Sequence, residues 1–198
     1  MKTLFQSAAL ACLVPLLSFS AEWKVDPNHS TAGFAVRHMM VSTVHGSFSG
    51  LKGTIDYDPA NLDASKANLT IDATTVDTRN ENRDKDLRSS KFFDVEKYPT
   101  ITFVSKRVIP QGQAKFQLVG DMTMHGVTKE VTFAVEGPMP AVKDARGNLH
   151  SGASATAKIN RKDFGLTWSG PLEGGGVTVG DEVELTVEIE MTQAAKTT

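Results

Sequence analysis

The chain has 198 residues, with 21 Lys and Arg against 23 Asp and Glu, and Cys12 is its single cysteine. The length is enough for one domain with a sizeable core. The formal net charge of −2 gives no reason to expect a nucleic acid or an anionic membrane surface as a partner. One cysteine can form neither an internal disulfide framework nor a cysteine metal site, so the core must hold the fold together unaided.

The first twenty residues have the order that is typical of a secretory signal peptide. Lys2 supplies a positive charge, an apolar run covers 4–17, and small residues lie before a cleavage point after Ser20. The run is about 14 residues, shorter than the roughly 20 that a membrane-spanning helix needs. A retained anchor is the alternative, and a lipid-attachment site is disfavoured because Cys12 lies in the middle of the run. We therefore predict a signal peptide over 1–20 and a mature domain over 21–198 in the periplasm, with no membrane span.

Alternation of apolar and polar residues predicts strands throughout the mature chain. It is strictest in 183–191, where every odd position is apolar and every even position is Glu or Thr. This pattern is typical of a strand with one buried face. Similar stretches occur, in chain order, at 34–38, 69–73, 100–103, 116–124, 131–135 and 153–159. Within 44–57 the apolar parity changes at 50–53, which we interpret as one strand with a glycine-flanked β-bulge or a sharp bend.

These strands predict an all-β fold, an antiparallel barrel of about eight strands. Only the charged stretch near 80–92 departs from strand character, and we predict a short helical segment there that crosses an end of the sheet. The glycine-rich segment 169–180 is predicted to be a loop. A barrel of this size is either filled by side chains or holds one small ligand. Small residues such as Gly120 and Ala155 would leave volume inside unless large partners face them, so alternation leaves both interiors open.

Catalytic patterns in the sequence are weak. No nucleophile elbow, phosphate loop or zinc-binding helix motif occurs, and the five histidines are not paired at metal-ligand spacing on one element. Asp26, His29 and Ser30 could be drawn as a relay, but Asp26-Pro27-Asn28 favours a turn. His38 lies on the apolar face of its strand, where a histidine is more often a core or rim residue than a ligand. We therefore predict no catalytic residue and no metal site.

The charged stretch 79–97 has two interpretations. It carries both signs of charge, which is typical of a solvated surface. The functional alternative is a lid whose Arg83, Arg88 or Lys91 meets an anionic head group. Phe92 and Phe93 are too apolar to be left in water, so we expect them to plug the barrel end or to touch a ligand.

Several blocks of the mature chain are specific enough to compare with a family. They are Trp23-x-x-Asp26-x-x-His29-Ser30, Asn82-Arg-Asp84, Phe92-Phe-Asp-Val95, Gly120-Asp-Met-Thr-Met-His125-Gly126 and Arg161-x-Asp163-Phe-Gly165-Leu. This pattern resembles the YceI-like family of polyisoprenoid-binding proteins over essentially the whole mature chain. The resemblance implies a lipocalin-like barrel, usually periplasmic, that holds a long isoprenoid or other lipid tail without catalysis. One departure is Asp86, where family members commonly carry His, and it puts in doubt a simple transfer of head-group preference.

We therefore expect a non-enzymatic binding or carrier protein for a long isoprenoid lipid, such as a polyprenyl phosphate or a prenyl quinone, with no cofactor. A fatty acid or fatty amide is the alternative ligand. An enzyme acting on a lipid head group through Asp86, Arg83 and His38, and a filled barrel with a structural role, are the rival classes. The sequence leaves the oligomeric state open, a homodimer included. The expected ligand-binding residues are Phe34, Val36, His38, Phe48, Phe92, Phe93, Phe103, Phe116, Met122, Met124, Phe133 and Trp168.

Overall fold

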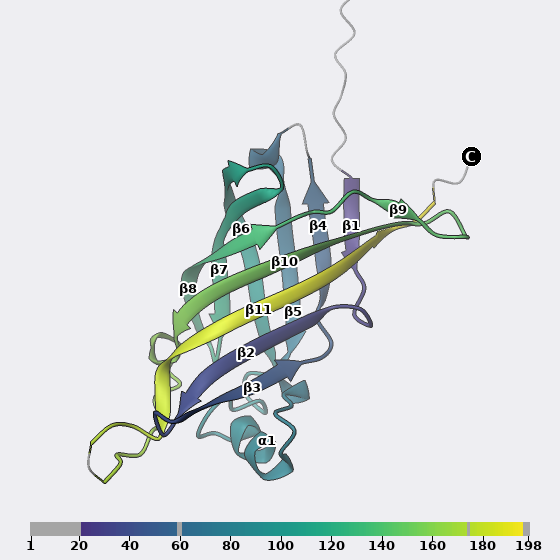
Figure 1. Ribbon diagram of the computed structural model, residues 1–198. Helices are drawn as coiled ribbons and strands as arrows, with labels where there is room; N and C mark the ends of the chain where they lie inside the picture. Colours follow the sequence, from purple (N-terminus) through teal and green to yellow (C-terminus); the bar gives the residue numbers. More distant parts are fainter. Residues whose placement is uncertain (1–20, 59–60, 174, 196–198) are drawn as a thin grey trace, which may run out of the picture.

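The computed structural model describes residues 21–58, 61–173 and 175–195, so the predicted signal peptide lies outside the described residues. Antiparallel strands make up most of the molecule, with one short α-helix at one end (Figure 1). The strands are β1 (Ala21–Val25), β2 (Thr31–His38), β3 (Ser42–Phe48), β4 (Lys52–Tyr57), β5 (Lys66–Asp72), β6 (Thr100–Gly112), β7 (Lys115–Met124), β8 (Val127–Glu136), β9 (Val142–Lys143), β10 (Leu149–Asn160) and β11 (Val179–Gln193). The helices are α1 (Glu81–Arg88) and the 3-10 turns η1 (Leu62–Ala64), η2 (Ala73–Thr75) and η3 (Arg161–Phe164).

Eight of the strands close into a barrel. Each pairs antiparallel with its neighbour in the order β11, β1, β4, β5, β6, β7, β8, β10, and β10 pairs with β11 to complete the ring. The hairpin of β2 and β3 extends from β11, and the short β9 extends from β10. The prediction of an all-β antiparallel barrel of about eight strands with one short helix is therefore confirmed.

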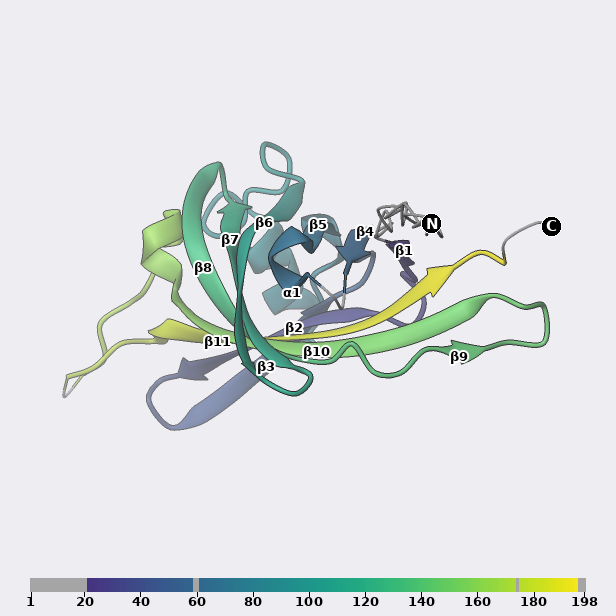
Figure 2. The same cartoon turned by 90° about the horizontal axis from the view of Figure 1, so that it is seen from above.

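The strand β11 has 15 residues, which is long enough to pair with three other strands where the barrel closes. One of its edges pairs with β10 from Glu182 to Gln193. Its other edge pairs first with β2 and then, near its end, with β1 (Figures 1 and 2). Strict alternation lets it present one continuous apolar face to the interior while both edges are hydrogen-bonded.

The helix α1 lies across one end of the barrel, as the charged stretch predicted (Figure 1). Asn80 caps it by accepting a hydrogen bond from the Arg83 amide at 3.0 Å. The buried carboxylate of Asp84 accepts from both the amide and the hydroxyl of Thr78, at 2.8 and 2.6 Å. These bonds hold the helix against the segment that links it to β5. In the described part of the chain, no helix has the length and apolar character needed to cross a membrane.

The parity change within 44–57 marks a boundary between two strands, so the prediction of a single strand is wrong, whereas the sharp bend expected at the glycines is present as a turn. The strand β3 ends at Phe48 and pairs with β2, whereas β4 begins at Lys52 and pairs with β1 and β5. Gly50, with φ of 75°, turns the chain between them. The parity resets because two independent strands carry the two halves.

Candidate ligand-binding cavity

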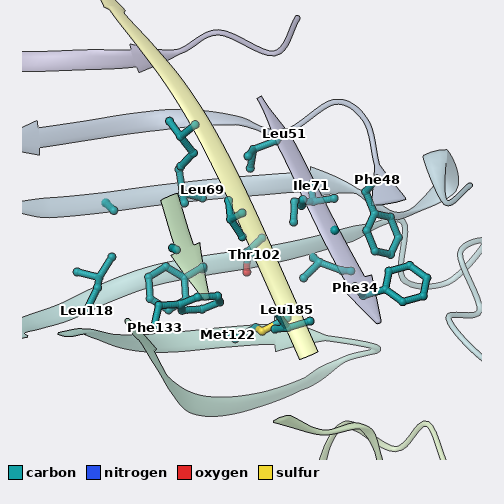
Figure 3. A pocket seen from close by; sticks show the side chains of 18 of the residues that line it. Phe34, Phe48, Leu51, Leu69, Ile71, Thr102, Leu118, Met122, Phe133 and Leu185 are labelled. Atoms are coloured by element: carbon teal, nitrogen blue, oxygen red, sulfur yellow. The ribbon is translucent and has the colours of Figure 1, made fainter. Parts of the chain in front are cut away.

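The barrel encloses a cavity of about 220 Å³. Its wall is built almost entirely of apolar side chains. They come from seven strands of the ring (all except β1), from the β2–β3 hairpin and from α1. Figure 3 shows Leu69 of β5, Met122 of β7 and Leu185 of β11 among the side chains that line it. A cavity of about 150 Å³ already accommodates a benzene-sized guest, so this volume is well above that of a packing defect.

The cavity is unfilled because one strand of its wall carries small side chains. On β10, Ala153 pairs with Ile189 and Ala155 pairs with Val187. All four residues face the interior and line the cavity. A methyl group across from a branched side chain leaves room that two branched side chains would fill. The structure thus decides the question that alternation left open, in favour of a hollow interior.

Gly120, in contrast, leaves no free volume. A Cβ added at this position would lie 2.5 Å from the Val104 carbonyl oxygen and 2.6 Å from Phe103 Cζ. The Phe103 ring occupies the space beside Gly120 and packs edge-to-face against Phe133, with centroids 5.2 Å apart. Of the two alternatives that the sequence left open for Gly120, the structure shows the second, because a large neighbouring ring fills the space beside the glycine.

Aromatic rings close the end of the cavity next to α1. Phe48 packs against Phe34 on one side and Phe93 on the other, with centroid distances of 5.6 and 5.5 Å. Leu87 adds the inward side of α1 to the same wall. Gly46 allows this arrangement, since a Cβ there would lie 2.6 Å from Phe34 Cε1. The expected role of Phe93 as a plug agrees with its position.

Ten of the twelve residues expected to bind ligand lie in the cavity wall. They are Phe34, Val36, Phe48, Phe92, Phe93, Phe103, Phe116, Met122, Met124 and Phe133. His38 and Trp168 do not line the cavity. Trp168 is 42% exposed and packs against Phe92 with a centroid distance of 5.3 Å. His38 ends β2 at its hairpin, where it pairs with Ser42. Direct binding by any of the twelve stays a prediction.

The expected set omitted much of the wall. The strands β10 and β11 contribute Ala153, Ala155, Ile159, Val183, Leu185, Val187, Ile189 and Met191, and β4 and β5 contribute Ile55, Leu69 and Ile71. The signal for these positions was the same alternation that identified the strands. They were not expected because small and aliphatic residues look like ordinary core in a sequence.

Arg161 is a charged residue in the cavity wall, but its hydrogen-bonding capacity is used by the protein. It is 4% exposed, and burial lowers the pKa of its guanidinium. Its Nε donates to the Gly180 carbonyl at 2.8 Å. Its two terminal nitrogens donate to the carbonyls of Leu166, Trp168 and Val179, and one of them also reaches Asp181 at 3.4 Å. A guanidinium has five N–H donors, so little capacity is left for a ligand.

The charged stretch near α1 is held mainly by internal contacts. Arg83 donates to the Thr78 hydroxyl and carbonyl, and Arg88 donates to the carbonyls of Thr74 and Val76 at 2.8 Å. Asp86 is 60% exposed and lies 3.9 Å from Lys91. Among the described residues, no hydrogen bond or ion pair joins Asp86, Arg83 and His38.

The fold and the cavity define a class: a closed, lipocalin-like antiparallel β-barrel with an apolar interior. The YceI-like domain model matches residues 23–191. The chain belongs to the YceI-like family, as its sequence blocks indicated.

Known relatives agree with this assignment. A UPF0312 protein of Vibrio vulnificus is 35% identical over 182 residues, which cover 91% of this chain and 93% of the relative. The crystal structure of the Campylobacter jejuni YCEI protein is 31% identical, with a TM-score of 0.69, and the match covers 80% of this chain and 90% of that chain. A structure described as a polyisoprenoid binding domain from Saccharophagus degradans shares the fold, with 15% identity, a TM-score of 0.62 and coverage of 87% and 98%.

Proposed function

We propose that this protein is a periplasmic carrier that holds the tail of a long isoprenoid lipid, such as a polyprenyl phosphate or a prenyl quinone, inside its barrel. The observation that carries the proposal is the cavity itself. It lies inside the barrel and is lined by aliphatic and aromatic carbon. Burial of each methylene contributes about 0.8 kcal/mol, so a long apolar tail gains enough from such a wall to bind well.

The wall favours recognition of the tail over the head group. Arg161 has little capacity for a phosphate because it donates to protein carbonyls and to Asp181. Lys66, at the start of β5, is exposed and also borders the cavity. We therefore expect the head group to remain near water and to contribute less to affinity than the tail does.

Family membership supports a binding protein over an enzyme. The Saccharophagus degradans neighbour is described as a polyisoprenoid binding domain, and the same fold is present here. The rival enzyme needed Asp86, Arg83 and His38 in one site, but Arg83 is bonded to Thr78 and Asp86 is exposed beside Lys91. The lipid, the carrier role and the absence of catalysis are our inferences for this chain.

Export to the periplasm rests on the first twenty residues. Cleavage after export is supported by three features of this segment: Lys2, the apolar run over 4–17 and the small residues before Ala21. N-terminal sequencing of protein recovered from the periplasmic fraction checks this part. A chain that begins at Ala21 supports it, and a chain that retains residue 1 in the membrane fraction contradicts it.

The lipid is identified by extraction of the protein after expression of the full chain in a bacterial host. Purified protein is denatured in organic solvent, and the extract is analysed by mass spectrometry. We expect an isoprenoid chain in stoichiometric amount. Fatty acid or fatty amide in its place would favour the alternative ligand, and a protein that carries no lipid and takes up neither class from micelles would overturn the proposal.

A competition series tests the dominance of the tail. Polyprenyl phosphate, polyprenol and prenyl quinone of equal tail length are expected to compete with affinities within about tenfold, because the wall meets only the tail. A series of shortened tails with one head group is expected to weaken step by step. Affinity that depends on the head group and ignores tail length would contradict the proposed mode of binding.

A further inference from the structure

A cluster of histidines and carboxylates lies outside the cavity, where the loop between β1 and β2 meets β11 (Figure 1). Asp26 and His29 come from this loop, and Glu190 comes from β11. One ligand atom of each residue lies within 4.8 Å of those of the other two. The sequence assigned Asp26 and His29 to a turn, and the Asn28 amide indeed donates to Asp26 Oδ1 at 2.8 Å. Only the fold adds Glu190 to them.

Hydrogen bonds to the backbone of Glu190 fix the three residues relative to one another. The Asp26 amide donates to the Glu190 carbonyl at 2.8 Å. At the other end of the loop, the Ser30 hydroxyl donates to the same carbonyl at 3.2 Å and accepts from the Glu190 amide at 3.0 Å. The loop is therefore tied to Glu190 on both sides of His29. Such ties hold the side chains of distant residues in one place without a disulfide.

The side chains of the cluster offer oxygen and nitrogen atoms that can bind a metal ion. Asp26 Oδ2 lies 2.9 Å from His29 Nδ1, and Asp26 Oδ1 is already held by the Asn28 amide. In a tetrahedral zinc site, bonds of about 2.0–2.1 Å place neighbouring ligand atoms roughly 3.3 Å apart. A metal ion would thus replace the proton between Asp26 and His29 after a shift of a few tenths of an ångström. His29 is 64% exposed, so water can complete the coordination.

A second pair lies behind Glu190 and orients it. His150 Nδ1 lies 2.9 Å from Glu190 Oε1, and His150 Nε2 lies 3.3 Å from Asp144 Oδ2. Carboxylates that bind metals are commonly held in this way by hydrogen-bonding neighbours. The His150–Asp144 pair leaves the second oxygen of Glu190 available to an ion.

The charge of the cluster also favours a cation. In the described part of the chain, the ion pairs of Asp26, Glu190 and Asp144 are all with histidine and none is with Lys or Arg. Neutral imidazoles leave these three negative charges without compensation.

We infer that Asp26, His29 and Glu190 form a binding site for one divalent transition-metal ion of the zinc class. The combination of one imidazole with carboxylates suits zinc and its neighbours in the first transition row. Calcium, which prefers oxygen ligands alone, is expected to bind weakly or not at all. The site lies outside the lipid cavity and is independent of the proposed lipid function.

The test measures zinc binding to the mature protein without an affinity tag, by competition with a chromophoric chelator and by calorimetry near pH 7.5. We expect one zinc ion per chain. Glu190→Gln and His29→Gln are each expected to weaken binding by about tenfold or more, and His150→Gln to weaken it by about tenfold through the orientation of Glu190. His29→Gln is the decisive variant because an exposed side chain can be changed without unfolding the protein.

His45→Gln is the matched control, since His45 is exposed on β3 and belongs to no such cluster among the residues that the structure describes. It is expected to leave zinc affinity unchanged, and calcium is expected not to displace zinc. Circular dichroism checks that each variant is folded. The inference is overturned if zinc does not bind saturably, if His29→Gln and Glu190→Gln bind zinc as the unchanged protein does, or if His45→Gln weakens binding equally. Lipid content measured in the same samples reports separately on the cavity.

Discussion

Ala155 of β10 lies directly across from Val187 of β11, and both side chains line the cavity. The pair shows why the barrel is hollow: the seam that closes the ring is made of a strand of small residues against a strand of branched ones. The volume beside Ala155 belongs to the interior, whereas its neighbour Thr156 is exposed on the outer face.

Ala155→Phe is expected to fill the cavity and to weaken lipid binding by at least tenfold while the barrel still folds. The ring would occupy volume that now faces Val187, although overpacking costs about 1–3 kcal/mol of stability. Lipid uptake from micelles, followed by native mass spectrometry, measures the loss. Thr156→Phe places the same ring on the outer face and is expected to leave uptake unchanged. Equal uptake by both variants would show that the lipid does not occupy this part of the barrel.

Gly46→Ala is expected to lower the free energy of unfolding by about 1–3 kcal/mol, because the added methyl group meets the Phe34 ring. Phe34→Leu removes the ring atoms in that contact, so the double variant should be more stable than the sum of the two single changes predicts. Denaturant unfolding of the four proteins gives the coupling energy directly.

Gly120→Ala is the counterpart with a different expected outcome. The added methyl group would meet Phe103 Cζ at 2.6 Å but also the Val104 carbonyl oxygen at 2.5 Å and Ser105 Cα at 2.8 Å. Two of these three neighbours are backbone atoms, which cannot rotate away. Phe103→Leu is therefore expected to restore little of the stability lost in Gly120→Ala. A coupling energy as large as that between Gly46 and Phe34 would contradict this prediction.

Arg161→Met is expected to lower the free energy of unfolding by about 3 kcal/mol or more, because it leaves several carbonyls without a donor in a buried position. Arg161→Lys should not restore stability, since an ammonium cannot reproduce the planar fork. Arg107→Met, which removes an exposed pair with Glu130, serves as the control with an expected effect of about 0–1 kcal/mol. Similar losses in Arg161→Met and Arg107→Met would mean that the buried bonds are weak.

Asp144 should titrate far below an ordinary aspartate. Its pKa is lowered to about 2, and the largest cause is the hydrogen bond from the Asn148 side chain. A lowered pKa in the folded state means that this group stabilises the fold above the pKa of the unfolded chain. That contribution is lost as the pH falls toward 2. Carboxyl NMR titration should show Asn148→Ala raising the pKa of Asp144, and an unchanged value would exclude Asn148 as the main cause.

Local pattern was enough to predict the strands and their faces. Strict alternation over 183–191 and 153–159 identified β11 and β10, because a strand turns successive side chains to opposite sides. The same rule placed Phe103 and Met122 on an inward face. It failed at 44–57, where a change of parity inside a strand and a change from one strand to the next give the same sequence pattern.

The sequence by itself therefore determined the fold class, the presence of the helix α1 and most of the aromatic residues in the cavity wall. These followed from alternation, from charge and from the sequence blocks. Only the tertiary structure decided that the interior is hollow, because the volume beside Ala155 depends on Val187 across the closing seam. Only the tertiary structure showed that Arg161 is bonded to carbonyls and that Glu190 joins the loop at Asp26. These relationships join residues as far apart as Ser30 and Glu190, 160 positions along the chain. They arise from the closure of the barrel, which no local pattern encodes.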